Sequence, residues 1–316
     1  MKLLKLVPDH TNLDFMRWRN LALVLSLIAT VASLAFTAYR GLNLGVDFVG
    51  GQLIRVTFAQ PIDVDKLRGQ VLGLQLGEAG VQEFGGPKTY QIRLPKPPGG
   101  DAAANIVATK VKQLIASDYP GARVDSVDTV SGKVSEELAE DSAKAIVFAM
   151  LGIAIYIWWR FEWQFGVGAL LTLAHDIAMT LGFFAFTQRE VDLNVVAAFL
   201  TIVGYSLNDT VVIYDRIREN LRKYRKMAIL PLLNLSLNET LARTVVTSLT
   251  VLIALGVLML IGPEVIFSLA IAIFLGVVIG TYSSIYISSP VLVWLGVTPH
   301  SFVKTDEKDE AEAQPA

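Results

Sequence analysis

The sequence predicts a polytopic α-helical membrane protein with six transmembrane helices and one α+β domain between the first two spans. Of the 316 residues, 53% are hydrophobic and 18% are charged, and the mean hydropathy of +0.50 is high for a soluble domain. The apolar residues gather in runs long enough to cross a bilayer. Residues 40–140 are the longest polar interruption between these runs, which predicts a domain outside the membrane.

The first span is predicted at residues 20–39, an uncharged run between Arg19 and Arg40. At about 1.5 Å per residue, this run matches a hydrocarbon core of about 30 Å. A cleaved signal peptide is the alternative, because basic residues precede the run. Its apolar region would be only about 7 to 15 residues long, so a retained anchor is favoured. Residues 141–303 hold the other predicted spans, at about 141–159, 163–188, 191–215, 242–262 and 265–294.

The basic residues of the short loops predict the orientation, because such loops stay in the cytoplasm. They occur in three segments that share one side of a six-span model, namely residues 1–19, Arg160 and residues 216–226. Both termini are then cytoplasmic, and the domain of about residues 41–135 is periplasmic, together with the connections at Arg189 and Glu264. Residues 304–316 are predicted to be a disordered cytoplasmic tail.

The periplasmic segment, residues 40–140 with its connector, is predicted to be a small α+β domain. Alternating apolar and polar residues predict strands at 52–58, 81–84, 89–94 and 123–130. Two helices are predicted, at 63–75, where Asp63 can cap the first turn, and at 102–117. The order βαββαβ is that of a ferredoxin-like split-βαβ unit.

The composition excludes several kinds of site. The chain has no cysteine, so it has no disulfides, thiolate metal sites or cysteine nucleophiles, and its three histidines are widely separated in sequence. The net charge of −2 does not indicate nucleic-acid binding. The basic run 216–226 is interpreted as a cluster beside the membrane that can contact anionic lipid. No catalytic triad, metal-ligand spacing or phosphate-binding loop occurs, so we expect no enzymatic activity, no cofactor and no metal.

Three ionisable residues lie within predicted spans, where a charge costs at least about 2.5 to 3.5 kcal/mol. They are Asp176, Asp209 and Arg243. Asp209 lies in the cytoplasmic half of its span and Arg243 begins the next span from the cytoplasmic side, so the two can meet at similar depth. We hypothesise that Asp209 takes up and releases protons near Arg243. Alternatively, Arg243 could pair with Glu239 one turn earlier, or extend to the headgroups.

His175 is a weaker candidate. It precedes Asp176 in the third span and could belong to the same proton pathway. The alternative is that it only forms a hydrogen bond within the helix bundle. Asp176 shares a helical stripe with Thr172 and Thr180, one turn before it and one turn after it.

Four motifs carry a resemblance to a known family. They are Gly45-Val46-Asp47-Phe48-Val49-Gly50-Gly51, Ala174-His175-Asp176-Ile177, the segment from Gly204 to Asn220 (GYSLNDTVVIYDRIREN), and Leu241-Ala242-Arg243-Thr244. The sequence resembles the SecD/SecF family of bacterial protein-export membrane proteins, in the RND superfamily, and its SecF members in particular. Gly45, Asp47, Phe48, Gly50, Gly51, Gly204 and Asn208 are expected to be structural motif residues.

The resemblance implies an accessory subunit of the Sec protein translocase in the bacterial inner membrane. Its partners would be a SecD-like subunit, the SecYEG translocon, YajC or YidC, membrane lipids and unfolded exported preproteins. The proton-motive force would assist late translocation, with Asp209, Arg243, Asp176 and His175 as the candidate proton pathway. One Asp and one Arg suit Na⁺ as well as H⁺.

Two other functions remain open from the sequence. One is half of an RND-type exporter of small molecules or lipids, although such pumps generally have twelve spans in one chain. The other is a scaffold that holds translocon components together and whose charges serve only packing.

One segment departs from the family pattern. Where the family reads Val-Gly-Pro-x-Val ahead of its second span, this chain has Val130-Ser131-Gly132-Lys133-Val134. The Gly-Pro hinge is absent, so the coupling of the α+β domain to the second span cannot be carried over from the family.

Overall fold

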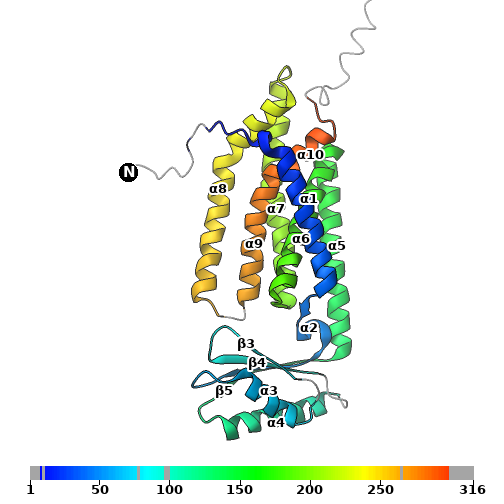
Figure 1. The fold of residues 1–316 in the computed structure, drawn as a ribbon. Coiled ribbons are helices and arrows are strands. Elements are labelled where there is room, and N and C mark those ends of the chain that lie inside the picture. The colour runs from blue at the N-terminus through cyan, green and yellow to red at the C-terminus, as the bar shows by residue number, and fades with distance from the viewer. Residues whose placement is uncertain (1–7, 9–10, 77–78, 96–99, 264–265, 299–316) are drawn as a thin grey trace, which may run out of the picture.

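The computed structural model describes residues 8, 11–76, 79–95, 100–263 and 266–298. Six helices in these ranges are long and apolar enough to cross a membrane, as predicted. They form a bundle with the α+β domain at one end (Figure 1). The bundle consists of a 3₁₀ turn (Phe15–Trp18) leading into α1 (Arg19–Arg40), α5 (Gly132–Arg160), α6 (Trp163–Thr187), α7 (Leu193–Lys223), α8 (Ile229–Ile261) and the last span, which begins with α9 (Phe267–Ser283).

The second span is part of a longer helix than its apolar run. Helix α5 begins at Gly132, because the Ser131 hydroxyl accepts a hydrogen bond from the Val134 N–H at 3.3 Å and caps the first turn. A serine N-cap therefore stands where the family pattern has its Gly-Pro. The helix runs without a break from the end of the α+β domain into the bundle, so the two are joined by a continuous helix (Figure 1).

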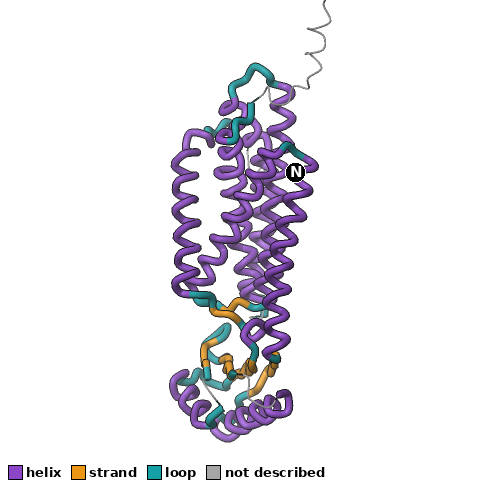
Figure 2. Tube along the Cα trace, turned by 90° about the vertical axis from the view of Figure 1, so that its right-hand side faces the viewer, coloured by secondary structure: helices purple, strands orange, loops and turns teal. Residues whose placement is uncertain are grey.

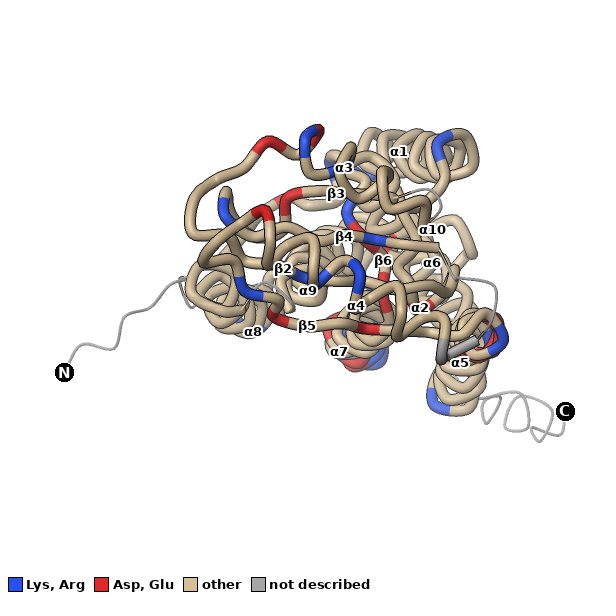
Figure 3. Tube along the Cα trace, turned by 90° about the horizontal axis from the view of Figure 1, so that it is seen from below, with Lys and Arg blue, Asp and Glu red and all other residues tan. Residues whose placement is uncertain are grey.

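The six spans differ in how much of their surface the bundle covers. About half of the most apolar window is buried in α6 (56%) and in the last span (50%), but only 6% is buried in α5 and 17% in α8. Viewed from the α+β end, α5 and α8 lie on opposite sides at the periphery, with α9 between them (Figure 3). The exposed faces of α5 and α8 are apolar and suit lipid or another membrane protein.

Small residues allow the central helices to approach closely. A Cβ atom added at Gly276 of α9 would overlap the Ile202 side chain of α7, and one added at Gly182 of α6 would overlap Ser33 of α1. Contacts of this kind are typical of helix pairs in membranes, where packing replaces the hydrophobic effect.

Gly276→Ala is expected to destabilise the bundle by about 1 to 3 kcal/mol through overpacking. The added methyl group would meet Cγ1 and Cγ2 of Ile202, which cannot move without displacing α7. The matched control is Gly256→Ala on α8, where nothing lies within 4 Å of the added Cβ. Thermal unfolding of the purified chain in detergent should show a lower midpoint for Gly276→Ala only. An equal shift for both variants would contradict the close packing of α7 and α9.

The last span is not a single regular helix. After α9 the backbone widens into a π-helical segment, Ser284–Ser288, before α10 (Ser289–Trp294). Pro290 explains the change, because it has no N–H to donate to the preceding turn and its ring displaces that carbonyl. Such π segments often occur at functional sites, and this one packs against α6 and α7.

The α+β domain has the predicted βαββαβ order. Its elements are β2 (Gly51–Thr57), α3 (Val64–Gly73), β3 (Gly80–Glu83), β4 (Thr89–Leu94), α4 (Gly100–Asp118) and β5 (Arg123–Val130). The strands form an antiparallel sheet in the order β3-β4-β2-β5. Alternate apolar side chains of the sheet, including Ile54, Val56 and Ile92, pack against α3 and α4. Because α3 and α4 cover the face that points away from the bundle, the polar face of the sheet points toward it (Figure 1).

A second, two-stranded sheet joins the domain to the bundle. Strand β1 (Asn43–Leu44) follows α1 and pairs in parallel with β6 (Glu190–Val191), which connects α6 to α7. The one-turn helix α2 (Val46–Val49) follows β1 and packs against the start of α5. These pieces lie between the helices and the larger sheet, where Figure 2 shows strand and loop segments below the bundle.

Some predicted features fall outside the described residues. These are the tail 304–316, the basic residues Lys2 and Lys5, Glu264 in the connection before the last span, and the two histidines His10 and His300.

Candidate functional site

Asp176 is the centre of a buried hydrogen-bond network that joins three helices. Its side chain is fully buried in α6. The Oδ2 atom accepts hydrogen bonds from Ser206 Oγ of α7 at 2.6 Å and from Ser283 Oγ of α9 at 2.9 Å. The Oδ1 atom lies 2.9 Å from Nδ1 of His175. Both carboxylate oxygens are therefore satisfied, which a carboxylate buried in a membrane bundle requires.

The predicted stripe on α6 supports Asp176 without contacting its carboxylate. Thr172 and Thr180 are buried, and their hydroxyls donate to the carbonyls of Gly168 and Asp176, each at 2.8 Å. These bonds satisfy the threonine hydroxyls within α6 itself.

His175 lies between Asp176 and the outside of the bundle. It is 6% exposed and borders an apolar cavity of about 460 Å³ between α1 and α6. Its ring therefore connects that cavity to the Asp176 carboxylate through one hydrogen bond.

Asp209 has a different environment from Asp176. It is buried in α7, with 3% of its surface exposed, and its Oδ2 atom has no hydrogen-bond partner among the residues that the structure describes. Ser206, which donates a hydrogen bond to Asp176 of α6, lies one turn before Asp209 on α7. The Asp176 carboxylate therefore contacts the same side of α7 on which Asp209 lies. A buried carboxylate without donors needs a counter-charge or a proton at this depth.

Arg243 acts on Asp209 electrostatically but is not bonded to it. No ion pair or hydrogen bond joins these two described residues, although their charges interact. Arg243 is exposed at the surface of α8 and lines an open cavity of about 450 Å³. The other lining residues include Tyr156 of α5 and Gly204 and Asn208 of α7. The predicted meeting of Asp209 and Arg243 is thus a proximity across the gap between α7 and α8.

The alternative pairing of Arg243 with Glu239 is not present. The Glu239 carboxylate accepts hydrogen bonds from Arg216 Nε and Asn220 Nδ2 of α7, each at 2.7 Å. Asn220 also donates to Ser236 of α8 at 3.0 Å. This network holds the α7 and α8 ends together and leaves Arg243 without a carboxylate partner on its own helix.

The motif after the first span forms the junction between domain and bundle. The Asp47 carboxylate accepts a hydrogen bond from the Leu193 N–H at the start of α7, at 3.1 Å. Phe48 packs on the cluster formed by α6, α7 and α9. Gly50 has a φ of +73°, and a Cβ atom there would lie 3.3 Å from the Gly132 Cα. The glycine thus allows both the turn into β2 and the close approach of α5.

Glu190 connects this junction to the sheet of the α+β domain. Its carboxylate forms an ion pair with Arg93 of β4 at 2.8 Å and accepts a hydrogen bond from Gln91 of β4 at 2.7 Å. Arg93 also donates to the Leu44 carbonyl at 2.9 Å. A Cβ atom at Gly45 would lie 3.0 Å from Glu190 Oε1, so this glycine makes room for the carboxylate.

Three residues of this arrangement were not predicted from the sequence. They are Ser206, Ser283 and Glu190. The serines could have been noticed as small polar residues inside apolar spans, where they often bond across helices. Glu190 gave no signal, because an acidic residue in a short hairpin is usually solvated.

Within the described ranges, no group of three or more His, Cys, Asp or Glu side chains is close enough to hold a metal ion.

Comparisons with known proteins agree with these features. The family model for the C-terminal part of the protein export membrane proteins SecD/SecF matches residues 110–298, and the SecD/SecF GG motif matches residues 40–62. Protein translocase subunit SecF of Rickettsia conorii is 42% identical over 264 residues, which cover 83% of this chain and 84% of that protein. Protein translocase subunit SecF of Rhodobacter capsulatus is 40% identical over 273 residues, with 83% and 82% covered.

Two solved structures are also similar. The crystal structure of SecDF, a translocon-associated membrane protein from Thermus thermophilus, matches 92% of this chain with a TM-score of 0.84 and 31% identity. A structure of SecDF in the super-membrane-facing form matches 96% of this chain with a TM-score of 0.67 and 31% identity. The chain spans only 39% and 40% of those two chains.

Proposed function

This chain belongs to the SecD/SecF family, and we propose that it is the SecF-type subunit of a protein translocase that uses the proton-motive force to assist late translocation of unfolded proteins. It resides in the bacterial inner membrane as a multi-pass protein. Both termini are cytoplasmic and the α+β domain is periplasmic. Its energy comes from proton movement through the bundle rather than from an enzymatic reaction.

The observation that carries this proposal is the environment of Asp209. Its Oδ2 atom is buried without a partner, whereas the carboxylate of Asp176 is fully bonded. The buried Asp209 carboxylate can be stabilised either by a bound proton or by the positive charge of Arg243. The ionised form favours a short distance between α7 and α8, whereas the protonated form does not need Arg243 nearby. Asp176 and His175 have the more rigid role, because their bonds hold α6, α7 and α9 together.

Helix α7 is the proposed route from Asp209 to the periplasmic domain. The backbone N–H of its first residue, Leu193, donates a hydrogen bond to Asp47. The preceding strand β6 contains Glu190, which forms an ion pair with Arg93 of β4. A shift of α7 would therefore reach the sheet through these contacts. The difference in fit to the two SecDF structures supports a movable arrangement in this family.

A SecD-like subunit is the proposed partner at the open face of the bundle. The exposed apolar faces of α5 and α8 flank the cavity that Arg243 and Asn208 line. A neighbouring span there would bury Arg243 and could supply its carboxylate partner. The SecDF chains are more than twice as long as this one, which leaves room for such a subunit. SecYEG, with YajC or YidC, and unfolded preproteins complete the proposed assembly.

Reconstituted vesicles test this function. They would contain the translocon, the SecD-like partner and this chain, and either a proton gradient or a sodium gradient would be imposed after translocation has begun. We expect the proton gradient to accelerate completion of translocation only when this chain is present. A sodium gradient of equal size should have no effect.

Other outcomes would point to other functions. Acceleration that is independent of any gradient would indicate a scaffold. Acceleration by the sodium gradient alone would show that Na⁺, and not H⁺, is the coupling ion. If the chain had no effect on translocation under any condition, the proposal would be refuted.

A further inference from the structure

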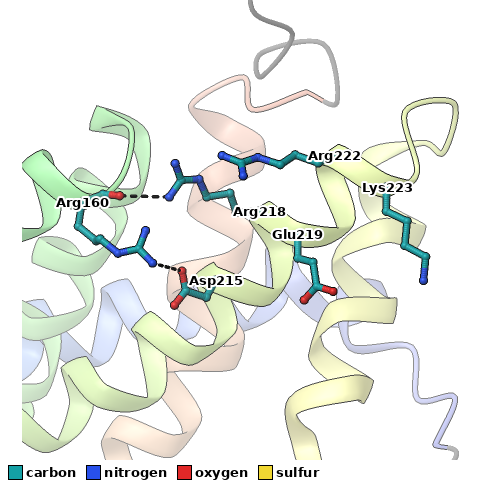
Figure 4. A pocket seen from close by; sticks show the side chains of 6 residues that line it. All are labelled: Arg160, Asp215, Arg218, Glu219, Arg222 and Lys223. Carbon is teal, nitrogen blue, oxygen red and sulfur yellow. Dashed lines mark hydrogen bonds and ion pairs between the residues drawn. The ribbon is translucent and has the colours of Figure 1, made fainter.

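We propose that a basic pocket between α5 and α7, at the end of the bundle far from the α+β domain, binds the phosphate group of an anionic phospholipid. The pocket has a volume of about 620 Å³. It is lined by Arg160, Asp215, Arg218, Glu219, Arg222 and Lys223 (Figure 4). The lining thus includes four cationic residues and only two carboxylates, which favours an anionic ligand.

Two of the arginines are held in place by the protein. The guanidinium groups of Arg160 and Arg218 lie over the same Phe161 ring, at 5.0 and 5.8 Å from its centre. Arg160 also pairs with Asp215 at 3.2 Å, and Arg218 donates to the Arg160 carbonyl at 3.2 Å. These contacts fix the arginines without using all of their N–H donors, because a guanidinium carries five. The pocket is therefore partly organised before a ligand arrives.

The nearby carboxylates form ion pairs with Arg160 and Arg218 but leave the Arg218 Nε donor without a hydrogen bond among the described residues. Asp215 is used by Arg160, and Glu219 pairs with Arg216 at 2.7 Å. Glu162 forms a long ion pair with Arg218, with its Oε1 atom 4.0 Å from Arg218 Nε, but it does not accept a hydrogen bond from this nitrogen. Arg218 therefore retains unsatisfied donors.

Arg222 is the residue that most clearly lacks a partner. Among the described residues it has no ion pair or hydrogen bond, and it lies one turn after Arg218 on the same side of α7. Like charges at this spacing destabilise a helix. In Figure 4 the side chains of Arg218 and Arg222 extend to the same side of the helix, toward Arg160, whereas Lys223 points away. A phosphate group between the two arginines would relieve their repulsion and use their free donors.

The pocket lies at the depth of lipid headgroups. Asp215 is 22 residues after Leu193, the first residue of α7, which is about 33 Å along the helix and just beyond a hydrocarbon core of about 30 Å. Trp158, Trp159 and Trp163 surround Arg160 in sequence and are 72%, 88% and 54% exposed. Exposed tryptophans at one level mark the membrane–water interface. The phosphate of a lipid with its chains along α5 would reach this pocket.

This inference does not depend on proton coupling through Asp209. It can be tested on the purified full-length chain in detergent, with short-chain phosphatidylglycerol as the anionic probe and short-chain phosphatidylcholine as the zwitterionic one. We expect clear preference for the anionic lipid. Arg222→Gln should weaken its binding about tenfold, the loss expected for one charge-assisted contact. The control is Arg225→Gln, which removes the same charge three residues further along, just after the end of α7, from a residue that does not line the pocket. It should change binding less than about twofold.

A second measurement tests lipid binding without the Arg222→Gln variant, whose weaker binding could also result from a folding defect. The chain has no cysteine, so Glu219→Cys provides a single reactive thiol at the pocket. Anionic nanodiscs should slow its labelling by a water-soluble, uncharged maleimide compared with zwitterionic nanodiscs, because a bound phosphate group would cover the pocket.

Three results would overturn the proposal. One is equal binding of the two lipids. Another is an equal loss for Arg222→Gln and Arg225→Gln. The last is competition by glycerol phosphate at the same concentration as the lipid, which would identify a site for soluble phosphate esters instead.

Discussion

Asp209→Asn is expected to abolish the part of translocation that depends on the proton gradient and to leave the gradient-independent rate unchanged. Asparagine has nearly the same shape but cannot exchange a proton, so the α7 environment keeps its packing and loses its titration. The unpartnered Oδ2 atom means that few local bonds are broken by the change. The measurement is the translocation rate of inverted vesicles or reconstituted vesicles with and without the gradient.

Asp215→Asn is the matched control for this experiment. It makes the same chemical change on the same helix, at a side chain that is 49% exposed and forms an ion pair with Arg160. Exposed ion pairs contribute about 0 to 1 kcal/mol, so gradient dependence should persist. If Asp209→Asn behaved like Asp215→Asn, the buried carboxylate would not be the site of coupling.

Glu190→Ala is expected to loosen the α+β domain from the bundle and to uncouple the two. The change removes the ion pair with Arg93 and the hydrogen bond from Gln91, both in a mostly buried setting. Charge-assisted bonds of this kind contribute about 2 kcal/mol, which corresponds to roughly a thirtyfold shift toward the undocked domain. Distances between spin labels on β5 and α8 should broaden, and gradient-driven translocation should fall while the subunit remains assembled.

Two further variants separate docking from general damage. Asp65→Ala breaks the exposed Asp65–Arg68 pair on the far side of the domain and should leave the label distances unchanged. The exchange Glu190→Arg with Arg93→Glu should restore part of the docking, because it rebuilds the ion pair in reverse. Unaltered distances in Glu190→Ala would show that the remaining connections, among them the β1–β6 pairing and the continuous α5 helix, hold the domain without Glu190.

The elements of this fold follow from local patterns that the sequence displays directly. Apolar runs of bilayer length predict six spans, and period-two alternation predicts the strands of β2 and β4. The order βαββαβ was predictable because each element is short and bounded by turn residues. The last span was predicted as one run at about 265–294, and its π segment at Ser284–Ser288 was not predicted.

The candidate site was only partly predictable. Ionisable residues inside apolar runs are visible in any sequence. Asp176 and Asp209 could therefore be chosen from the free-energy cost of a charge in the bilayer core. Their contrasting roles could not, because the sequence does not say which helix faces which. Asp176 is satisfied by serines 30 and 107 residues away in the chain, whereas Asp209 has an oxygen with no donor.

By itself, the sequence determined the membrane class, the six spans, the order of the α+β domain and the residues that can carry a charge inside the bundle. Only the tertiary structure decided that Asp176 is a structural hub, that Asp209 and Arg243 interact without contact, and that Glu190 and Asp47 join the domain to α7. The physical reason is that spans and strands are set by near neighbours in sequence. The partners of a buried charge are set by which helix faces pack together, a property of the whole bundle.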